Sequence, residues 1–169
     1  MSLGWQIASW TLSGRRAKVR LMHGVAGRGG FAMGAVDRDG APKRVNTMRS
    51  HGWDGPEVLA IEVINVGRAT LTVTGYSIHA VGTGMSYSPI GDRIGRELPF
   101  RLEPGEAETW YADMQDARAL VHSLAALGKS ATRVNMSVSL GTRQELKTPT
   151  SLRLGRHACL RLVGSFQHR

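Results

Sequence analysis

His157 and Cys159 are the two residues of this chain that come closest to a catalytic pair. They lie two positions apart, so a strand would place both side chains on one face, where an imidazole can activate a thiol. No third residue that would orient the histidine can be identified, and the pair lies near the C-terminal end. A buried or incidental cysteine explains the same residues more simply. We therefore expect no catalytic residues and no enzyme activity.

The spacing of the histidines does not indicate a metal site. The six histidines show neither H-x-H nor H-x-x-x-H spacing, and they lie at positions 23, 51, 79, 122, 157 and 168. Cys159 is the only cysteine, which excludes an intramolecular disulfide and a zinc site built on paired cysteines. We expect no bound metal ion.

A glycine-rich stretch at residues 24–31 is the one candidate for a phosphate-binding loop. Such a loop needs a following helix and either the Lys-Ser/Thr pair or the glycine spacing of dinucleotide sites. Here the alternation from Phe31 to Val36 indicates a strand instead, and the lysine pair is missing. The stretch predicts a hairpin or an Ω-shaped loop, and we expect no cofactor.

Residues suited to binding a partner are more abundant than candidate catalytic or metal-binding residues, because the chain carries an excess of arginine. The net charge is +9, with 18 Arg and 4 Lys. Residues 1–56 contribute +6, residues 57–128 contribute −4 and residues 129–169 contribute +7. Arginine favours bidentate contacts with carboxylate or phosphate, so this asymmetry indicates a partner-facing surface. Codon bias in a GC-rich genome would produce the same arginine content.

The candidate partner-binding residues are aromatic or basic and lie in three segments. Residues 1–14 form an uncharged apolar arm or a first strand, residues 41–56 form an irregular basic loop, and residues 156–169 form a basic tail. Tryptophan and arginine dominate the energetics of protein interfaces. The candidates are Trp5, Trp10, Lys43, Arg44, Arg49, Trp53, Arg153 and Arg156.

The segments between these candidates show the alternation of β-strands. Residues 57–74 predict a β-hairpin, because two runs with a period of two flank Asn65 and Gly67, which tolerate positive φ. Residues 132–148 predict a second hairpin by the same pattern. Glu103-Pro104-Gly105-Glu106 has the composition of a type II turn.

One amphipathic helix is predicted between these strands. Asp113 is a good N-cap, and Gly128 stands where a helix C-terminus commonly has glycine. The apolar residues between them recur at helical spacing: Met114, Ala117, Leu120, Val121, Leu124 and Leu127. We expect a mainly β chain, with a sandwich domain at residues 15–155 and the helix lying over one end or face.

No membrane span or signal peptide is predicted. Residues 2–14 are too few to cross a bilayer and lack a preceding basic stretch. The uncharged run at residues 69–91 contains many Thr, Ser and Gly, which favours strand and loop. We expect a protein of a virion or of the cytoplasm, with no membrane partner.

Two turn motifs give a resemblance at the level of fold. The pairing of Asn65-Val66-Gly67 with Leu102-Glu103-Pro104-Gly105-Glu106 resembles bacterial and phage immunoglobulin-like domains, in which N-x-G ends one strand and L-x-P-G-E precedes another. The resemblance covers about residues 57–111 and the alternation at 132–148. It implies an immunoglobulin-like antiparallel β-sandwich of about seven or eight strands, in a non-catalytic module for adhesion, spacing or decoration.

The function expected from these features is docking without chemistry. The most concrete version is a phage virion decoration or accessory structural protein that binds a protein partner within a larger assembly, with a homo-oligomer as one form of it. The alternative is a basic protein that binds nucleic acid or another anionic surface. Against it, aromatic residues do not alternate with the basic ones on a recognisable strand face.

Overall fold

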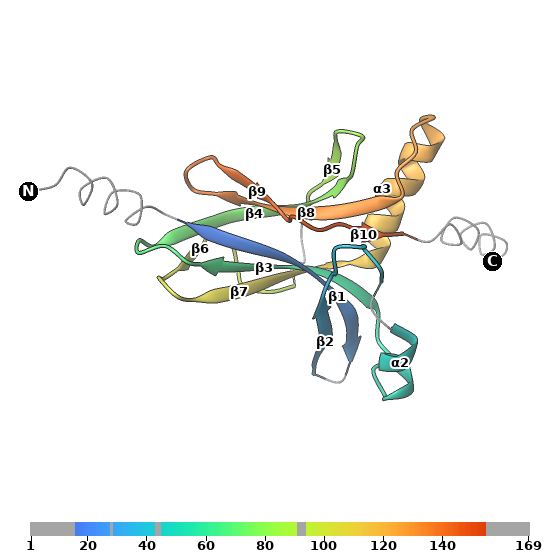
Figure 1. Cartoon of the computed structure of the whole chain (residues 1–169), viewed down its shortest axis with the longest axis horizontal. Helices are drawn as coiled ribbons and strands as arrows, with labels where there is room; N and C mark the ends of the chain where they lie inside the picture. Colours follow the sequence, from blue (N-terminus) through green and yellow to red (C-terminus); the bar gives the residue numbers. More distant parts are fainter. Residues whose placement is uncertain (1–15, 28, 43–44, 91–93, 155–169) are drawn as a thin grey trace, which may run out of the picture.

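The computed structural model describes residues 16–27, 29–42, 45–90 and 94–154 and shows two packed antiparallel sheets (Figure 1). Its strands are β1 (Ala17–Gly27), β2 (Gly30–Ala35), β3 (Glu57–Asn65), β4 (Leu71–Ala80), β5 (Met85–Tyr87), β6 (Phe100–Leu102), β7 (Ala107–Asp113), β8 (Arg133–Leu140), β9 (Glu145–Lys147) and β10 (Leu152–Arg153). Its helices are α2 (Val45–Ser50) and α3 (Met114–Ala126). Among these residues the chain is mainly β, as predicted.

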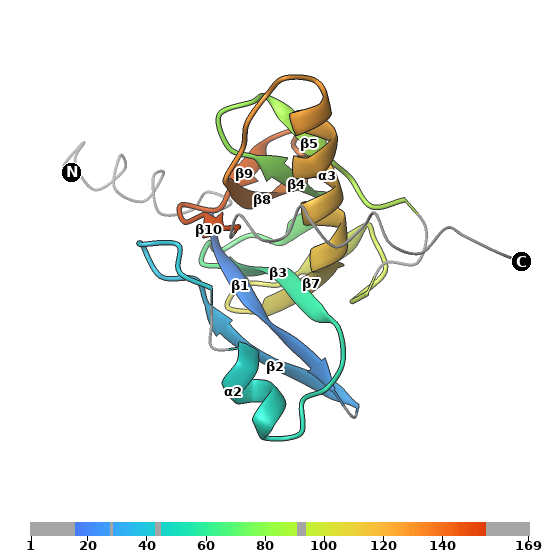
Figure 2. The same ribbon diagram turned by 90° about the vertical axis from the view of Figure 1, so that its right-hand side faces the viewer.

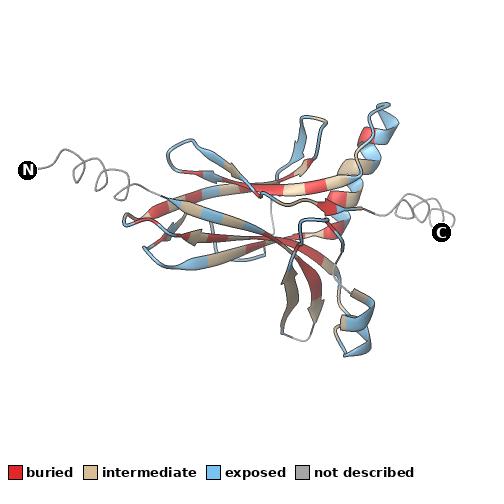
Figure 3. Ribbon diagram, in the orientation of Figure 1, coloured by how far each residue is buried: buried red, intermediate tan, exposed pale blue. Residues whose placement is uncertain are grey.

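The two sheets enclose one hydrophobic core. The first has the strand order β2-β1-β3-β7, and the second has β10-β8-β4-β5, with β6 added to β4 and β9 added to β8. Buried side chains form this core, including Leu21, Ile61, Val73, Trp110 and Val138. Figure 3 shows that buried positions occur along the strands of both sheets. This arrangement confirms a β-sandwich, which alternating strands form by burying one face of each sheet.

The predicted hairpin at residues 57–74 is wrong. β3 pairs with β1 and β7, whereas β4 pairs with β8, β5 and β6, so the two strands belong to opposite sheets. Neither Asn65 nor Gly67 is among the described residues with positive φ. Two successive strands that each have one apolar face can form a hairpin or can cross from one sheet to the other. The sequence pattern does not distinguish these arrangements, because both bury the apolar faces in the same core.

The other predicted turns hold, and the basic loop contains a helix. The glycine-rich stretch at residues 24–31 lies in the β1–β2 hairpin, and residues 133–147 form the β8–β9 hairpin. Gly105 has φ +85°, and the Glu106 amide donates to the Glu103 carbonyl over 3.1 Å. Helix α2 lies inside the segment predicted to be irregular, because six residues are too few to show a period.

The predicted helix is confirmed together with its caps. The Asp113 carboxylate accepts from the Gln115 amide over 2.8 Å, and Gly128 has φ +70°. The Lys129 amide donates to the Leu124 carbonyl over 2.9 Å, which closes the C-terminus as a Schellman motif. Figure 2 shows α3 standing across the ends of both sheets, so the helix closes one end of the sandwich.

Candidate docking site

A first cluster of polar side chains fastens α3 to the first sheet. His23 on β1 is fully buried, and its Nε2 lies 2.7 Å from Oε1 of Glu57 on β3. The other carboxylate oxygen of Glu57 accepts from the Arg118 guanidinium of α3. Burial would raise the pKa of Glu57, but the hydrogen bonds from His23 and Arg118 outweigh it and lower that pKa. The cluster joins three elements and has a structural role.

A second cluster, on the outer face of the other sheet, has the residue types of a catalytic triad. His79 Nε2 lies 2.7 Å from Ser137 Oγ and 3.0 Å from Glu145 Oε1, and Ser137 Oγ donates to the same Glu145 oxygen over 2.6 Å. A triad needs the serine and the acid on different ring nitrogens, so that the histidine can pass a proton between them. Here both contact one nitrogen, and this geometry does not support nucleophilic catalysis.

The protonation states in this second cluster follow from the same contacts. Burial lowers the pKa of His79, and the nearby Lys147 ammonium lowers it further, although Glu145 opposes both. The hydrogen bond from Ser137 lowers the pKa of Glu145. His79, Ser137 and Glu145 thus link β4, β8 and β9 on this face.

Exposed apolar side chains lie on β5, in the turn before it and at the C-terminal end of α3. Met85 and Tyr87 pair with Ala80 and Ile78 of β4, so they lie on the face of the sheet that α3 covers. Both are partly exposed, as is Val81, and α3 contacts both β4 and β5. Leu127, the C-cap of the helix, is 68% exposed. We call Val81, Met85, Tyr87 and Leu127 the β5–α3 corner.

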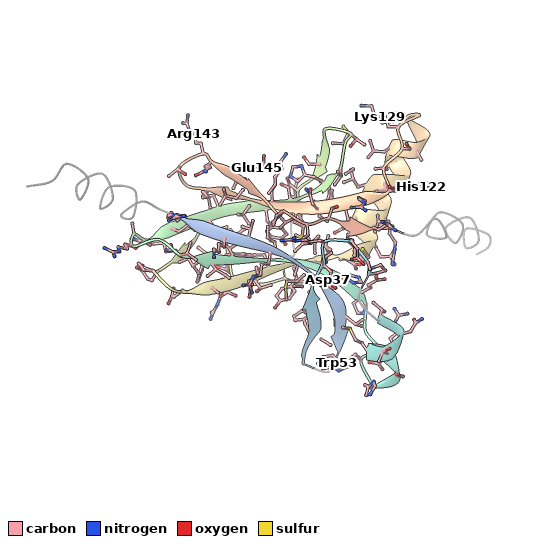
Figure 4. All side chains as sticks on the ribbon, viewed as in Figure 1. Asp37, Trp53, His122, Lys129, Arg143 and Glu145 are labelled. Carbon is pink, nitrogen blue, oxygen red and sulfur yellow. The ribbon has the colours of Figure 1, made fainter. Side chains whose placement is uncertain are left out.

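The surroundings of the corner decide which partners suit it. β5 pairs with β4 alone among the described strands and is an edge of its sheet. Ile90, three residues after Tyr87, is 94% exposed. Lys129 lies two residues after Leu127, and the Arg133 carbonyl accepts from the Val81 amide over 3.0 Å, while the Arg133 guanidinium donates to the Asp39 carbonyl. Figure 4 shows Lys129 at this end of the molecule and Arg143 at the other. The corner therefore suits an apolar partner that carries no positive charge.

The structure separates the predicted site residues that it describes. Arg49 is exposed on α2, and Trp53 packs against the β1–β2 hairpin, where a Cβ on Gly27 would lie 2.4 Å from its ring. Arg153 lies on β10, directly opposite Arg133 of β8. These positions do not form one surface. The predicted residues Trp5, Trp10, Lys43, Arg44 and Arg156 lie outside the described residues, as do His157 and Cys159.

Sequence patterns do not single out the corner residues for binding. Met85 and Tyr87 fall in a stretch rich in Gly and Ser, where a strand of three residues shows no clear period. Helical spacing places Leu127 in the apolar stripe of the helix, but it lies at the C-cap, beyond the last buried residue, Leu124. The one signal in the sequence for an exposed apolar surface here is Ile90. This aliphatic residue lies in a polar loop and belongs to neither a strand pattern nor a helix pattern.

The described part of the chain contains neither a metal-binding cluster nor a membrane-spanning helix. No three His, Cys, Asp or Glu side chains there are grouped to hold a metal ion. None of the helices in the same residues is long and apolar enough to cross a membrane.

Comparison with known proteins identifies no relative. No protein family, curated protein or solved structure matches this sequence. The contacts and exposed surfaces of the chain itself are therefore the grounds for assigning it a function.

Proposed function

We propose that this chain is a non-catalytic docking module that binds a protein partner through the β5–α3 corner. The observation that carries the proposal is the group of four apolar side chains left partly exposed where an edge strand meets a helix end. Where exposed apolar side chains form a large patch on a soluble domain, the patch commonly marks a site of protein interaction. The most concrete role is that of a phage virion decoration or accessory structural protein.

The immunoglobulin-like character of the sandwich is part of this proposal. Its support is a junction in which the two motifs of the resemblance touch: the Asn65 amide donates to the Glu106 carbonyl, and the Gly105 amide donates to the Asn65 carbonyl, both over 2.9 Å. The Asn65 side chain also donates to the Leu102 carbonyl. The N-x-G and L-x-P-G-E segments thus form one structural unit.

Contacts within the two polar clusters support a role without chemistry. His23 and His79 each place a ring nitrogen against a carboxylate that is held by a further group, Arg118 in one case and Ser137 in the other. These polar atoms already hold strands and the helix together. A reaction would need some of them to be directed at a substrate instead.

Site-specific photo-crosslinking in the native assembly tests the docking role. We expect a benzophenone side chain in place of Tyr87 to crosslink to a protein of the assembly in high yield, because partner side chains cover that position. The same group in place of the exposed Thr142, in the β8–β9 turn, serves as the matched control and should give little product. Equal yields at both positions would contradict docking through the corner.

Binding of nucleic acid is the second candidate, favoured by a juxtaposition of basic residues. Arg153 lies opposite Arg133. The Arg153 amide donates to the Gly40 carbonyl over 2.8 Å, so basic residues of β8 and β10 lie beside the start of the basic loop at residues 41–56. The charge of the described residues argues against this candidate. They carry 14 Lys and Arg and 12 Asp and Glu, so their positive and negative charges nearly cancel.

Filter binding with single-stranded and duplex DNA tests this second candidate. If it holds, replacing Arg133 and Arg153 by Gln should weaken binding several-fold and reduce the slope of log affinity against log salt by about two. The matched control replaces Arg20 and Arg49, which lie elsewhere on the surface. Affinity that is independent of salt would exclude the candidate.

A further inference from the structure

We infer that the β5–α3 corner receives the uncharged N-terminal segment, residues 2–14, of a second copy of this chain. This inference rests on the proposed docking function and names its occupant. The segment carries Trp5, Ile7, Trp10 and Leu12 and no charged residue. Two tryptophans in an uncharged stretch are the chemistry that an apolar corner binds best.

The reach of the chain excludes a complete fit of this segment on its own corner. The Arg16 carbonyl accepts from the Gly67 amide over 3.0 Å, which fixes the start of the described chain beside the Leu71 end of β4. The corner lies at the Ala80 end, because Met85 pairs with Ala80. Ten residues of strand separate those ends by roughly 30 Å.

Trp10 lies only six residues before Arg16, and six residues span at most roughly 20 Å. Trp10 therefore falls short of Met85 at the far side of its own corner, whereas Trp5 could reach it. Only a second copy can bring both tryptophans to Met85. Such a contact is heterologous, joining the start of one molecule to the far end of the next, and it generates rings or filaments.

Charge distinguishes this occupant from the C-terminal segment. Residues 155–169 also carry apolar side chains and begin close by, since the Leu154 amide donates to the Thr132 carbonyl over 2.8 Å. They also carry Arg156, Arg161 and Arg169 and only basic charges. Lys129 lies two residues after Leu127 of the corner, so like charges disfavour that segment, while the neutral N-terminal segment meets no repulsion.

Complementation between two full-length variants tests the inference by sedimentation velocity. One variant carries Trp5→Ala and Trp10→Ala, and the other carries Met85→Lys and Leu127→Lys. We expect the wild type to associate with rising concentration and each variant alone to stay monomeric, with an affinity reduced roughly tenfold or more. An equimolar mixture should form a heterodimer that does not grow further, because each variant retains one half of the interface.

Three outcomes would overturn the inference. They are a wild type that stays monomeric, a mixture that stays monomeric although the wild type associates, and association that both variants retain. Crosslinking at Tyr87 separates this failure from that of the docking role. A crosslinked product with a different protein of the assembly would contradict the N-terminal segment as occupant but would keep the docking function. A product with residues 155–169 of the same chain would also contradict the N-terminal segment as occupant. Absence of any crosslinked product would contradict both proposals.

Discussion

Replacing Asn65 by Asp is expected to lower the free energy of unfolding by roughly 3–5 kcal/mol, a large share of the stability of a domain this size. Asn65 is fully buried, and its Nδ2 donates to the carbonyls of Ala69 and Leu102, each over 2.9 Å. Its Oδ1 accepts from the Gly67 amide over 3.0 Å. Aspartate has the same shape but directs a charged oxygen at the two carbonyls, which lose their donor and repel it.

Denaturant unfolding followed by circular dichroism measures this effect. Asn46→Asp is the matched control, because Asn46 is exposed in the first turn of α2 and the same change there should shift stability by no more than about 0.5 kcal/mol. A loss below about 1 kcal/mol for Asn65→Asp would mean that the contact between the two turns does not hold the sheets together.

Replacing Glu57 by Gln is expected to lower the free energy of unfolding by roughly 2–3 kcal/mol. The neutral amide keeps the shape of the carboxylate but has one acceptor oxygen in place of two, so it cannot accept from both His23 and Arg118. Glu57 and Arg118 retain some exposure, which places the loss below that of a completely buried pair. Thermal or chemical denaturation of the full chain measures the difference.

The contribution of Glu57 should also depend on pH in a defined direction. Its pKa is lower in the folded state than the ordinary carboxyl value, so the unfolded chain binds the proton more readily. The stability difference between the wild type and Glu57→Gln should be complete above roughly pH 5 and shrink as the pH falls below that.

Glu62→Gln on the same strand is the matched control for Glu57→Gln. Glu62 pairs with the exposed Arg20 over 3.4 Å, so its replacement should cost about 0.5 kcal/mol or less. Equal losses for the two variants would contradict the structural role of the Glu57 cluster.

Local patterns predict the elements of this fold better than their pairing. The N-cap at Asp113, the positive φ of Gly105 and Gly128 and the alternation of β8 all depend on neighbouring residues, and all were predictable. Whether β3 and β4 share a sheet depends instead on contacts with β1, β7 and β8, which lie far away in sequence. Asn65 has the residue type of a turn position, but it serves as a buried link between two turns.

The candidate site was less predictable than the fold. Arginine and tryptophan content favours the arm, the basic loop and the tail, and most of those residues lie outside the described ranges. The corner depends on exposure, which sequence does not display: Leu127 and Leu124 are the same residue type three positions apart, yet only Leu124 is buried. Such a surface emerges only when β5 is placed beside the end of α3.

Incorporation into the native assembly tests the docking claim most directly. The variant with Met85→Lys and Leu127→Lys should be retained in the sedimenting assembly at a level at least roughly tenfold below that of the wild type. Thr142→Lys, which adds a cation on a turn remote from the corner, should be retained like the wild type, and all three proteins should unfold at similar denaturant concentrations. Retention of the corner variant at the wild-type level would contradict the claim that this protein acts by docking through the β5–α3 corner.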